Sequence, residues 1–180
     1  MPDQEQGALF PNTALPDEFA GYRGPTACTA AGITYRQLDY WARTDLVVPT
    51  VRGAKGSGSQ RLYSFKDILV LRVVKRLLDT GVSLQNIRVA VDHLRARGVE
   101  DLAGVTLFSD GTTVYECTSP EEIVDLLQGG QGVFGIAVGG TMRDITGSLA
   151  EFPVERVEGD LVVPVEPDEL AQRRQARTAG

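Results

Sequence analysis

Arg36, Tyr40 and Arg43 recur at helical spacing in a short segment that also contains Leu38 and Trp41. At about 100° per residue the first three side chains form one stripe, and the other two fall on the opposite side. Guanidinium groups bind phosphate, and they also recognise guanine through its O6 and N7 atoms. The segment predicts a helix whose apolar back packs into a core and whose basic, aromatic front contacts a partner.

A second group of cations lies around the glycine-rich segment VRGAKGSGSQRLY, residues 51–63. Arg52, Lys55 and Arg61 could bind a polyanion through counterion release, and glycine lets the backbone approach a phosphate closely. Tyr63 carries a phenol able to bond phosphate, and its ring could equally support the hairpin. The alternative is a loop whose cations face only water.

The charge of the chain is unevenly distributed. The 180 residues carry a net charge of −6, yet residues 21–97 hold 13 Lys and Arg against 5 Asp and Glu. Everything outside that range holds 5 against 19. Such asymmetry suggests a nucleic-acid partner for the basic part, although the net charge alone would argue against one. A chance excess of solvated lysines and arginines is the alternative.

The remaining composition is that of a globular protein, with 42% hydrophobic and 23% charged residues. No stretch approaches the roughly 20 apolar residues of a membrane span, and the first residues lack the pattern of a secretory signal. Cys28 and Cys117 lie far apart, and His93 is the only histidine. We therefore expect a cytoplasmic protein with no membrane partner, no metal site, no cofactor and no enzymatic activity.

Residues 21–98 predict four helices and a two-stranded wing. The order helix, turn, helix, wing, helix, helix is that of a winged helix-turn-helix domain. The second helix has a complete start signal, with Thr34 at the N-cap and Gln37 in capping-box spacing. Other helix boundaries are marked by the caps Ser64 and Ser83 and by the terminating glycines Gly32, Gly81 and Gly98.

Residues 99–165 predict a small, acidic α+β unit. It contains a hairpin around Ser109-Asp110-Gly111, a helix capped by Ser119, and a further helix in TMRDITGSLAEF. Residues 1–20 are expected to form a flexible arm and residues 166–180 a polar tail. The fold class is thus α+β, an N-terminal winged helix-turn-helix followed by a small α+β domain.

Several motifs follow one another in a characteristic order between about residues 25 and 95. They are Gly32-Ile33-Thr34, Leu46-Val47-Val48-Pro49, Arg61-Leu62-Tyr63, Asp67-Ile68 with Leu71, and Gly81-Val82-Ser83-Leu84 with Ile87. This region resembles the DNA-binding domain of MerR-type transcription regulators. The resemblance implies a homodimer that binds double-stranded promoter DNA at the bacterial nucleoid. It leaves open a contact with RNA polymerase and a small-molecule effector.

The chain departs from that family at a few positions. Asp39 stands where the family commonly has arginine, and Asp45 where it has glycine. A carboxylate at position 39 would repel phosphate unless it pairs with a neighbouring arginine or accepts from cytosine N4. The family's metal-sensing cysteines and long coiled-coil helix are missing after Gly98, so the chain looks closer to a branch with an α+β C-terminal domain.

Individual roles follow from the helix-turn-helix layout, in which the N-terminal residues of the second helix meet base edges. We expect Thr34, Tyr35 and Arg36 near bases, and Tyr40 and Arg43 on phosphate. Two alternatives stay open, because Tyr40 could pack against the wing and Arg43 could simply be solvated.

One motif competes with this interpretation. Residues 130–135, GQGVFG, match G-x-G-x-x-G, but the strand that a dinucleotide site needs before the turn is not expected. Tight turns or a close-packed strand explain these glycines better, with a small-molecule pocket as the alternative. The sequence therefore predicts a sequence-specific DNA-binding transcription regulator. A ligand-sensing or protein-interaction module with incidental DNA binding is the second hypothesis.

Overall fold

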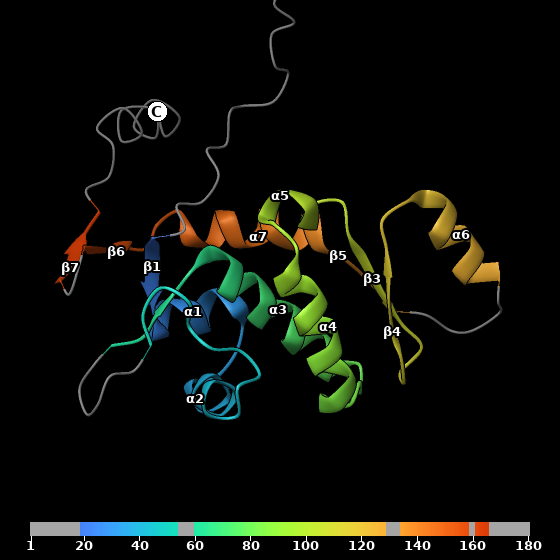
Figure 1. Cartoon of the computed structure of the whole chain (residues 1–180), viewed down its shortest axis with the longest axis horizontal. Coiled ribbons are helices and arrows are strands. Elements are labelled where there is room, and N and C mark those ends of the chain that lie inside the picture. Colours follow the sequence, from blue (N-terminus) through green and yellow to red (C-terminus); the bar gives the residue numbers. More distant parts are fainter. Residues whose placement is uncertain (1–18, 54–59, 129–133, 159–160, 166–180) are drawn as a thin grey trace, which may run out of the picture.

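The computed structural model of the chain describes residues 19–53, 60–128, 134–158 and 161–165. Membrane crossing would need a longer and more apolar helix than any in these ranges. The helices are α1 (Gly24–Ala31), α2 (Tyr35–Arg43), α3 (Phe65–Asp79), α4 (Leu84–Ala96), α5 (Val99–Leu102), α6 (Pro120–Gln128) and α7 (Val138–Leu149). The strands are β1 (Ala20–Arg23), β2 (Leu62–Tyr63), β3 (Thr106–Ser109), β4 (Val114–Cys117), β5 (Phe134–Ala137), β6 (Glu155–Glu158) and β7 (Leu161–Pro164). An α+β fold with an N-terminal helix-turn-helix is confirmed (Figure 1).

The turn between α1 and α2 and the start of α2 form as the sequence predicts. Gly32 has a φ of 70°, in the left-handed region that favours glycine, and its N–H donates to Cys28 O at 2.9 Å. Thr34 Oγ1 accepts from Gln37 N at 3.2 Å, and Gln37 Oε1 accepts from Thr34 N at 3.0 Å. This capping box fixes where α2 begins and which side chains form its outer face.

Helix α3 is the centre of the core and packs against α1, α4 and α7. Its start is also a capping box, in which Asp67 N donates to Ser64 Oγ at 3.1 Å and Ser64 N donates to Asp67 Oδ2 at 2.9 Å. Ile68, Leu71 and Val74 are fully buried, and each such side chain stabilises the fold by about 1.5–3 kcal/mol. The helices that carry the outer surfaces are therefore held by one continuous core.

A four-stranded sheet, in the order β2-β1-β6-β7, joins segments from both ends of the described chain. Tyr22 of β1 lies opposite Tyr63, and Ala20 lies opposite Arg156. Arg23 Nη2 lies 2.6 Å from Glu155 Oε1 across the second pairing. The sequence predicts no strand at residues 20–23, because both partners are distant in the chain. Residues 1–18 of the expected arm lie outside the described residues.

The wing is present in part. Leu62 N donates to Arg52 O at 2.9 Å and Arg52 N donates to Leu62 O at 3.2 Å, which forms a single antiparallel bridge. Within the described ranges, the expected second wing strand is reduced to this bridge. On its other side, β2 pairs with β1. The base of the wing is thus an edge of the four-stranded sheet, and its tip, residues 54–59, is not among the described residues.

The second sheet has the order β4-β3-β5, and its β3–β4 hairpin is the one that the sequence predicts. Asp110 Oδ1 accepts from the backbone N–H groups of Thr112 and Thr113 at 2.8 and 2.7 Å, which closes the turn. A Cβ atom on Gly135 would lie 3.0 Å from the ring of Phe108. Glycine at 135 therefore permits a close strand contact, in agreement with one reading of the glycine-rich motif.

Helix α7 covers α1 and α3 on the side away from α2 (Figure 1). Arg76 Nη1 of α3 donates to Thr141 Oγ1 of α7 at 3.1 Å, and Thr141 is buried. Residues after Gly98 therefore contribute α7 to the packing of α1 and α3, and the β6–β7 pair to the sheet that contains β1.

Two glycines of α7 give opposite predictions for alanine. A Cβ on Gly139 would lie 2.4 Å from the carbonyl oxygen of Ala103, whereas a Cβ on Gly147 would meet nothing within 4 Å. Gly139→Ala should lower the free energy of unfolding by about 1–3 kcal/mol, because the backbone must move. Gly147→Ala should raise it by about 0.5–1 kcal/mol, as alanine does in open helix positions. Urea unfolding of both variants checks the pair, and an equal effect of the two would contradict the close contact.

Candidate nucleic-acid interface

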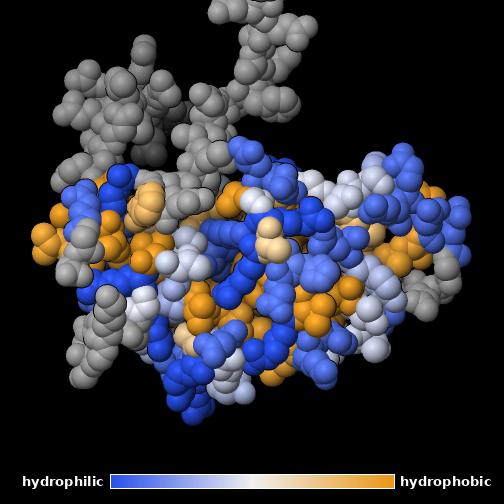
Figure 2. All heavy atoms as spheres, viewed as in Figure 1, coloured by the Kyte–Doolittle hydropathy of each residue, from blue (hydrophilic) through white to orange (hydrophobic). Residues whose placement is uncertain are grey.

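Helix α2 has one buried and one exposed face, which confirms the predicted division. Leu38, Trp41 and Ala42 are buried. Tyr35 and Tyr40 are 63% and 49% exposed, which is high for side chains of this size. Arg36 and Arg43 are also exposed. Figure 2 shows hydrophilic side chains at the edge of the molecule where α2 lies.

Four side chains of α2, namely Arg36, Gln37, Tyr40 and Arg43, border a shallow hollow that is largely open to solvent. Three of them belong to the stripe that the sequence predicts. Gln37 is an addition, because sequence reasoning treated it only as a cap, and its place between Arg36 and Tyr40 on the helix was the available signal. Its Oε1 is used by the capping box, while the side-chain amide also has donors that an adenine base can accept.

Asp39 lies in the same helix and is paired with two arginines. Its Oδ1 accepts from Arg61 Nη1 at 2.9 Å, and its Oδ2 lies 2.8 Å from Arg43 Nη2. The hydrogen bond from Arg61, with the charges of both guanidinium groups, holds the pKa of Asp39 below its ordinary value. Of the two roles considered for this acid, pairing with a neighbouring arginine is therefore the one observed.

The cations expected in the wing lie in different environments. Arg52 is half-buried in the bridge to Leu62, and the Arg61 side chain is only 20% exposed. Lys55 is outside the described residues. Arg43 and Arg61 thus share one carboxylate, so neither is a plain solvated cation.

Tyr63 requires a correction. Its side chain is fully buried, and burial raises the pKa of its phenol to about 12. A phenol in that position cannot reach a phosphate at the surface. The ring packs in the main core, which corresponds to the supporting role considered as the alternative.

The segment that links α2 to the wing is held in place by hydrogen bonds to Asp67. Thr50 donates to Asp67 Oδ2 from both its N–H and its hydroxyl, each at 2.8 Å. Ser64 N donates to the same oxygen at 2.9 Å. The N-cap of α3 therefore sets the path of the chain on both sides of the wing.

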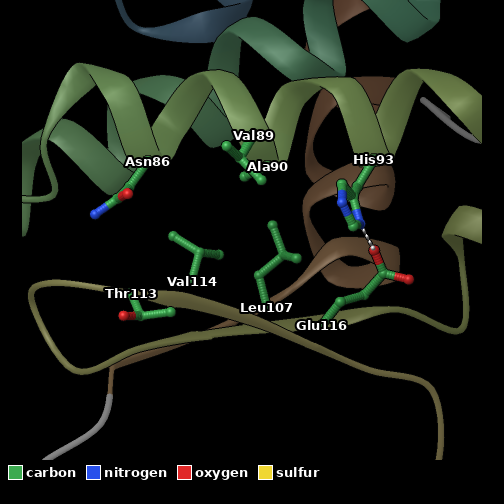
Figure 3. A pocket seen from close by; sticks show the side chains of 8 residues that line it. All are labelled: Asn86, Val89, Ala90, His93, Leu107, Thr113, Val114 and Glu116. Atoms are coloured by element: carbon green, nitrogen blue, oxygen red, sulfur yellow. Dashed lines mark ion pairs between the residues drawn. The ribbon is translucent and has the colours of Figure 1, made fainter.

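A second, partly open cavity of about 150 Å³ lies between α4 and the β3–β4 hairpin. Figure 3 shows apolar Val89, Ala90, Leu107 and Val114 at its centre, with Asn86, His93, Thr113 and Glu116 around them. His93 Nδ1 lies 3.8 Å from Glu116 Oε2. Glu116 also pairs with Arg97, so the acid at this end of the cavity already has a cationic partner.

Other groups with reactive potential are dispersed. Burial raises the pKa of both cysteine thiols, Cys28 and Cys117. Within the described ranges, no three His, Cys, Asp or Glu side chains come together as a metal site. The first part of the G-x-G-x-x-G match, residues 130–133, is not described.

Comparison with known proteins agrees with this geometry. The family described as "MerR HTH family regulatory protein" matches residues 22–94. An uncharacterized HTH-type transcriptional regulator of Mycobacterium tuberculosis is 72% identical over 172 residues, which cover 96% of this chain and 76% of the relative. A counterpart in Mycobacterium bovis gives the same values. The HTH-type transcriptional regulator HmrR of Sinorhizobium medicae is 30% identical over 83 residues, 45% of this chain and 54% of that protein. The chain belongs to the MerR family of helix-turn-helix transcriptional regulators.

Proposed function

We propose that the chain is a sequence-specific regulator that binds promoter operators as a homodimer, with α2 in the major groove. The observation that carries the proposal is the division of α2, where Arg36, Tyr40 and Arg43 are exposed on one side and Leu38, Trp41 and Ala42 are buried on the other. An α-helix fits the major groove, where arginine and glutamine can each form two hydrogen bonds with one base.

The side chains divide into base and phosphate contacts. Thr34, Tyr35 and Arg36 lie at the N-terminal end of α2, which meets base edges in helix-turn-helix domains. Tyr40 and Arg43, further along the helix, are assigned to phosphate, together with Arg52 and Lys55 of the wing. Arg61 and Tyr63 are better placed to support this surface than to touch DNA. The Arg61 side chain is only 20% exposed, against 67% for Arg43, and Tyr63 is buried.

Homodimerisation follows from the size of the surface. One small helix-turn-helix module buries too little area for strong specificity, so two copies on two half-sites are expected. We further propose that the protein acts in the cytoplasm at the nucleoid and that it contacts RNA polymerase. Sedimentation of the protein with its operator should give two chains per DNA duplex, and one chain per duplex would contradict the dimer.

Ligand sensing is a second candidate function, and the cavity between α4 and the hairpin favours it. A volume of about 150 Å³ is that of a cavity known to hold a single-ring compound. Its walls come from α4 and from the β3–β4 hairpin, so an occupant would touch both parts of the chain. A compound that raises the melting temperature of the wild type but not of a Leu107→Trp variant, and that changes operator affinity, would assign this role.

Selection from random duplexes and genomic fragments tests the main proposal. One enriched sequence with two related half-sites is expected at moderate salt, and its affinity should fall steeply as salt rises. An Arg36→Ala/Tyr40→Ala protein is the matched control, because both side chains are exposed and the fold should be kept. If the wild type enriches nothing beyond this control, the proposal is wrong.

A further inference from the structure

Asp39 connects the helix that faces outward to the base of the wing. It lies on α2, one turn before Arg43, and 22 positions before Arg61 in sequence. Each carboxylate oxygen has its own guanidinium partner, Arg61 at 2.9 Å and Arg43 at 2.8 Å. Arg61 precedes Leu62, whose backbone exchanges two hydrogen bonds with Arg52. One chain of contacts thus runs from the middle of α2 into the only wing bridge among the described residues.

We propose that Asp39 is a positioning residue that fixes the wing relative to α2, so that both elements meet DNA in one geometry. The proposal rests on the DNA-binding function above, and it concerns how that function is made selective. Nothing in the family match or in the relatives' names assigns a role to this position.

The geometry favours positioning over direct reading of a base. A carboxylate that reads cytosine must accept from N4, but here both oxygens already face guanidinium groups. The side chains of Asp39 and Arg61 are 30% and 20% exposed, against 67% for Arg43, so the Asp39–Arg61 pair is the less exposed of the two pairs. The pKa of Asp39 is lowered chiefly by the Arg61 hydrogen bond, so the acid is ionised at neutral pH and the junction is charged on both sides.

Two effects on DNA binding follow. With Asp39 present, two cations near the DNA surface are partly neutralised, and non-specific attraction to phosphate is reduced. Without it, the exposed Arg43 is free to follow phosphates on any sequence, and Arg61 no longer ties the wing to α2. Removing the carboxylate should therefore strengthen binding to unrelated DNA while weakening the preference for the operator.

The test uses the full-length chain and the isosteric variant Asp39→Asn. Without DNA, hydrogen exchange at the Arg52 and Leu62 amides should be several-fold faster in the variant, because the wing bridge loses its support. With DNA, the ratio of operator to unrelated-duplex affinity should fall about fivefold or more, and the salt dependence on unrelated DNA should steepen by about one charge. Asp45→Asn is the control, since it removes the same charge two residues after α2 ends and lies outside both ion pairs. Asn also tolerates the left-handed φ of 57° at this position.

A double-mutant cycle with Arg61→Ala separates the pair from the single residues. Both variants break the same contact, so the combined protein should lose no more discrimination than either one alone. Additive losses, or unchanged exchange and unchanged discrimination in Asp39→Asn, would overturn the proposal.

A direct reading role gives a different pattern. Asp39→Asn would then change the preferred base at one operator position, and Arg61→Ala would leave that preference intact, which also overturns positioning. If the wild type binds no DNA at all, the proposed function fails by itself. The hydrogen-exchange comparison still decides whether Asp39 holds the wing.

Discussion

Arg36→Ala should lower operator affinity by about 1–3 kcal/mol, or roughly 5- to 150-fold, and relax the preference at one or two base positions. Arg36 is exposed at the N-terminal part of α2 and lines the hollow formed with Gln37, Tyr40 and Arg43. Among the described residues no acid forms an ion pair with its guanidinium, whereas Arg43 pairs with Asp39. Alanine at 36 should therefore remove mainly a contact made in the complex. Titration of labelled operator, and repeated selection from random duplexes, measure the two effects.

Arg143→Ala is the matched control for this prediction. Arg143 is an exposed arginine on α7, which packs on the side of α1 and α3 away from α2 (Figure 1). Its removal changes the net charge equally, so the difference between the two variants isolates the α2 surface from general electrostatics. Equal affinities of both variants for the operator would remove Arg36 from the reading surface.

The parts of the fold that the sequence predicts are those with local causes. The turn at Gly32 and the caps at Thr34, Ser64 and Ser83 act within a few residues, and each forms as predicted. The β3–β4 hairpin likewise depends on its own turn around Asp110. Local chemistry of this kind can be read without knowing what else packs nearby.

The parts that the sequence does not predict have distant causes. β1 exists because β2 and β6 pair with it, and Arg23 pairs with Glu155, 132 positions away. Periodicity carries no information on such partners, because the four residues Ala20–Arg23 are too few to show a pattern. The packing of α7 on α1 and α3 is likewise a contact between segments far apart in sequence, which periodicity does not predict.

The candidate site divides in the same way. Helical periodicity alone separates the buried Leu38 and Trp41 from the exposed Tyr40. It cannot say that Arg61 reaches Asp39, nor that Tyr63 points into the core, because both depend on how the wing folds back. The resemblance to known regulators indicated Asp39 as unusual, and the contacts with Arg43 and Arg61 give that departure a physical meaning.

Trp41→Ala should lower the free energy of unfolding by about 3–5 kcal/mol, the range found when a large buried aromatic side chain is removed. Trp41 is 3% exposed and lies on the inner face of α2. Its carbonyl oxygen also accepts from the N–H groups of Leu46 and Val47 at 2.9 and 3.2 Å, which close the end of the helix. Because small domains are stable by only about 5–15 kcal/mol, this loss is large. Urea unfolding followed by circular dichroism measures this loss of stability. Tryptophan fluorescence cannot be used, because Trp41 is the only tryptophan in the sequence.

Tyr40→Ala provides the complementary variant, one position away on the outer face. Tyr40 is 49% exposed, so its loss should change stability by less than about 1 kcal/mol while weakening operator binding. Trp41→Phe should fall between the wild type and Trp41→Ala in stability and keep operator binding at low temperature. A stable Trp41→Ala protein, or a Tyr40→Ala protein that unfolds early, would contradict the assignment of the two faces. The expected result would show that two adjacent residues of α2 have different roles: Trp41 on the inner face stabilises the fold, and Tyr40 on the outer face contributes to DNA binding.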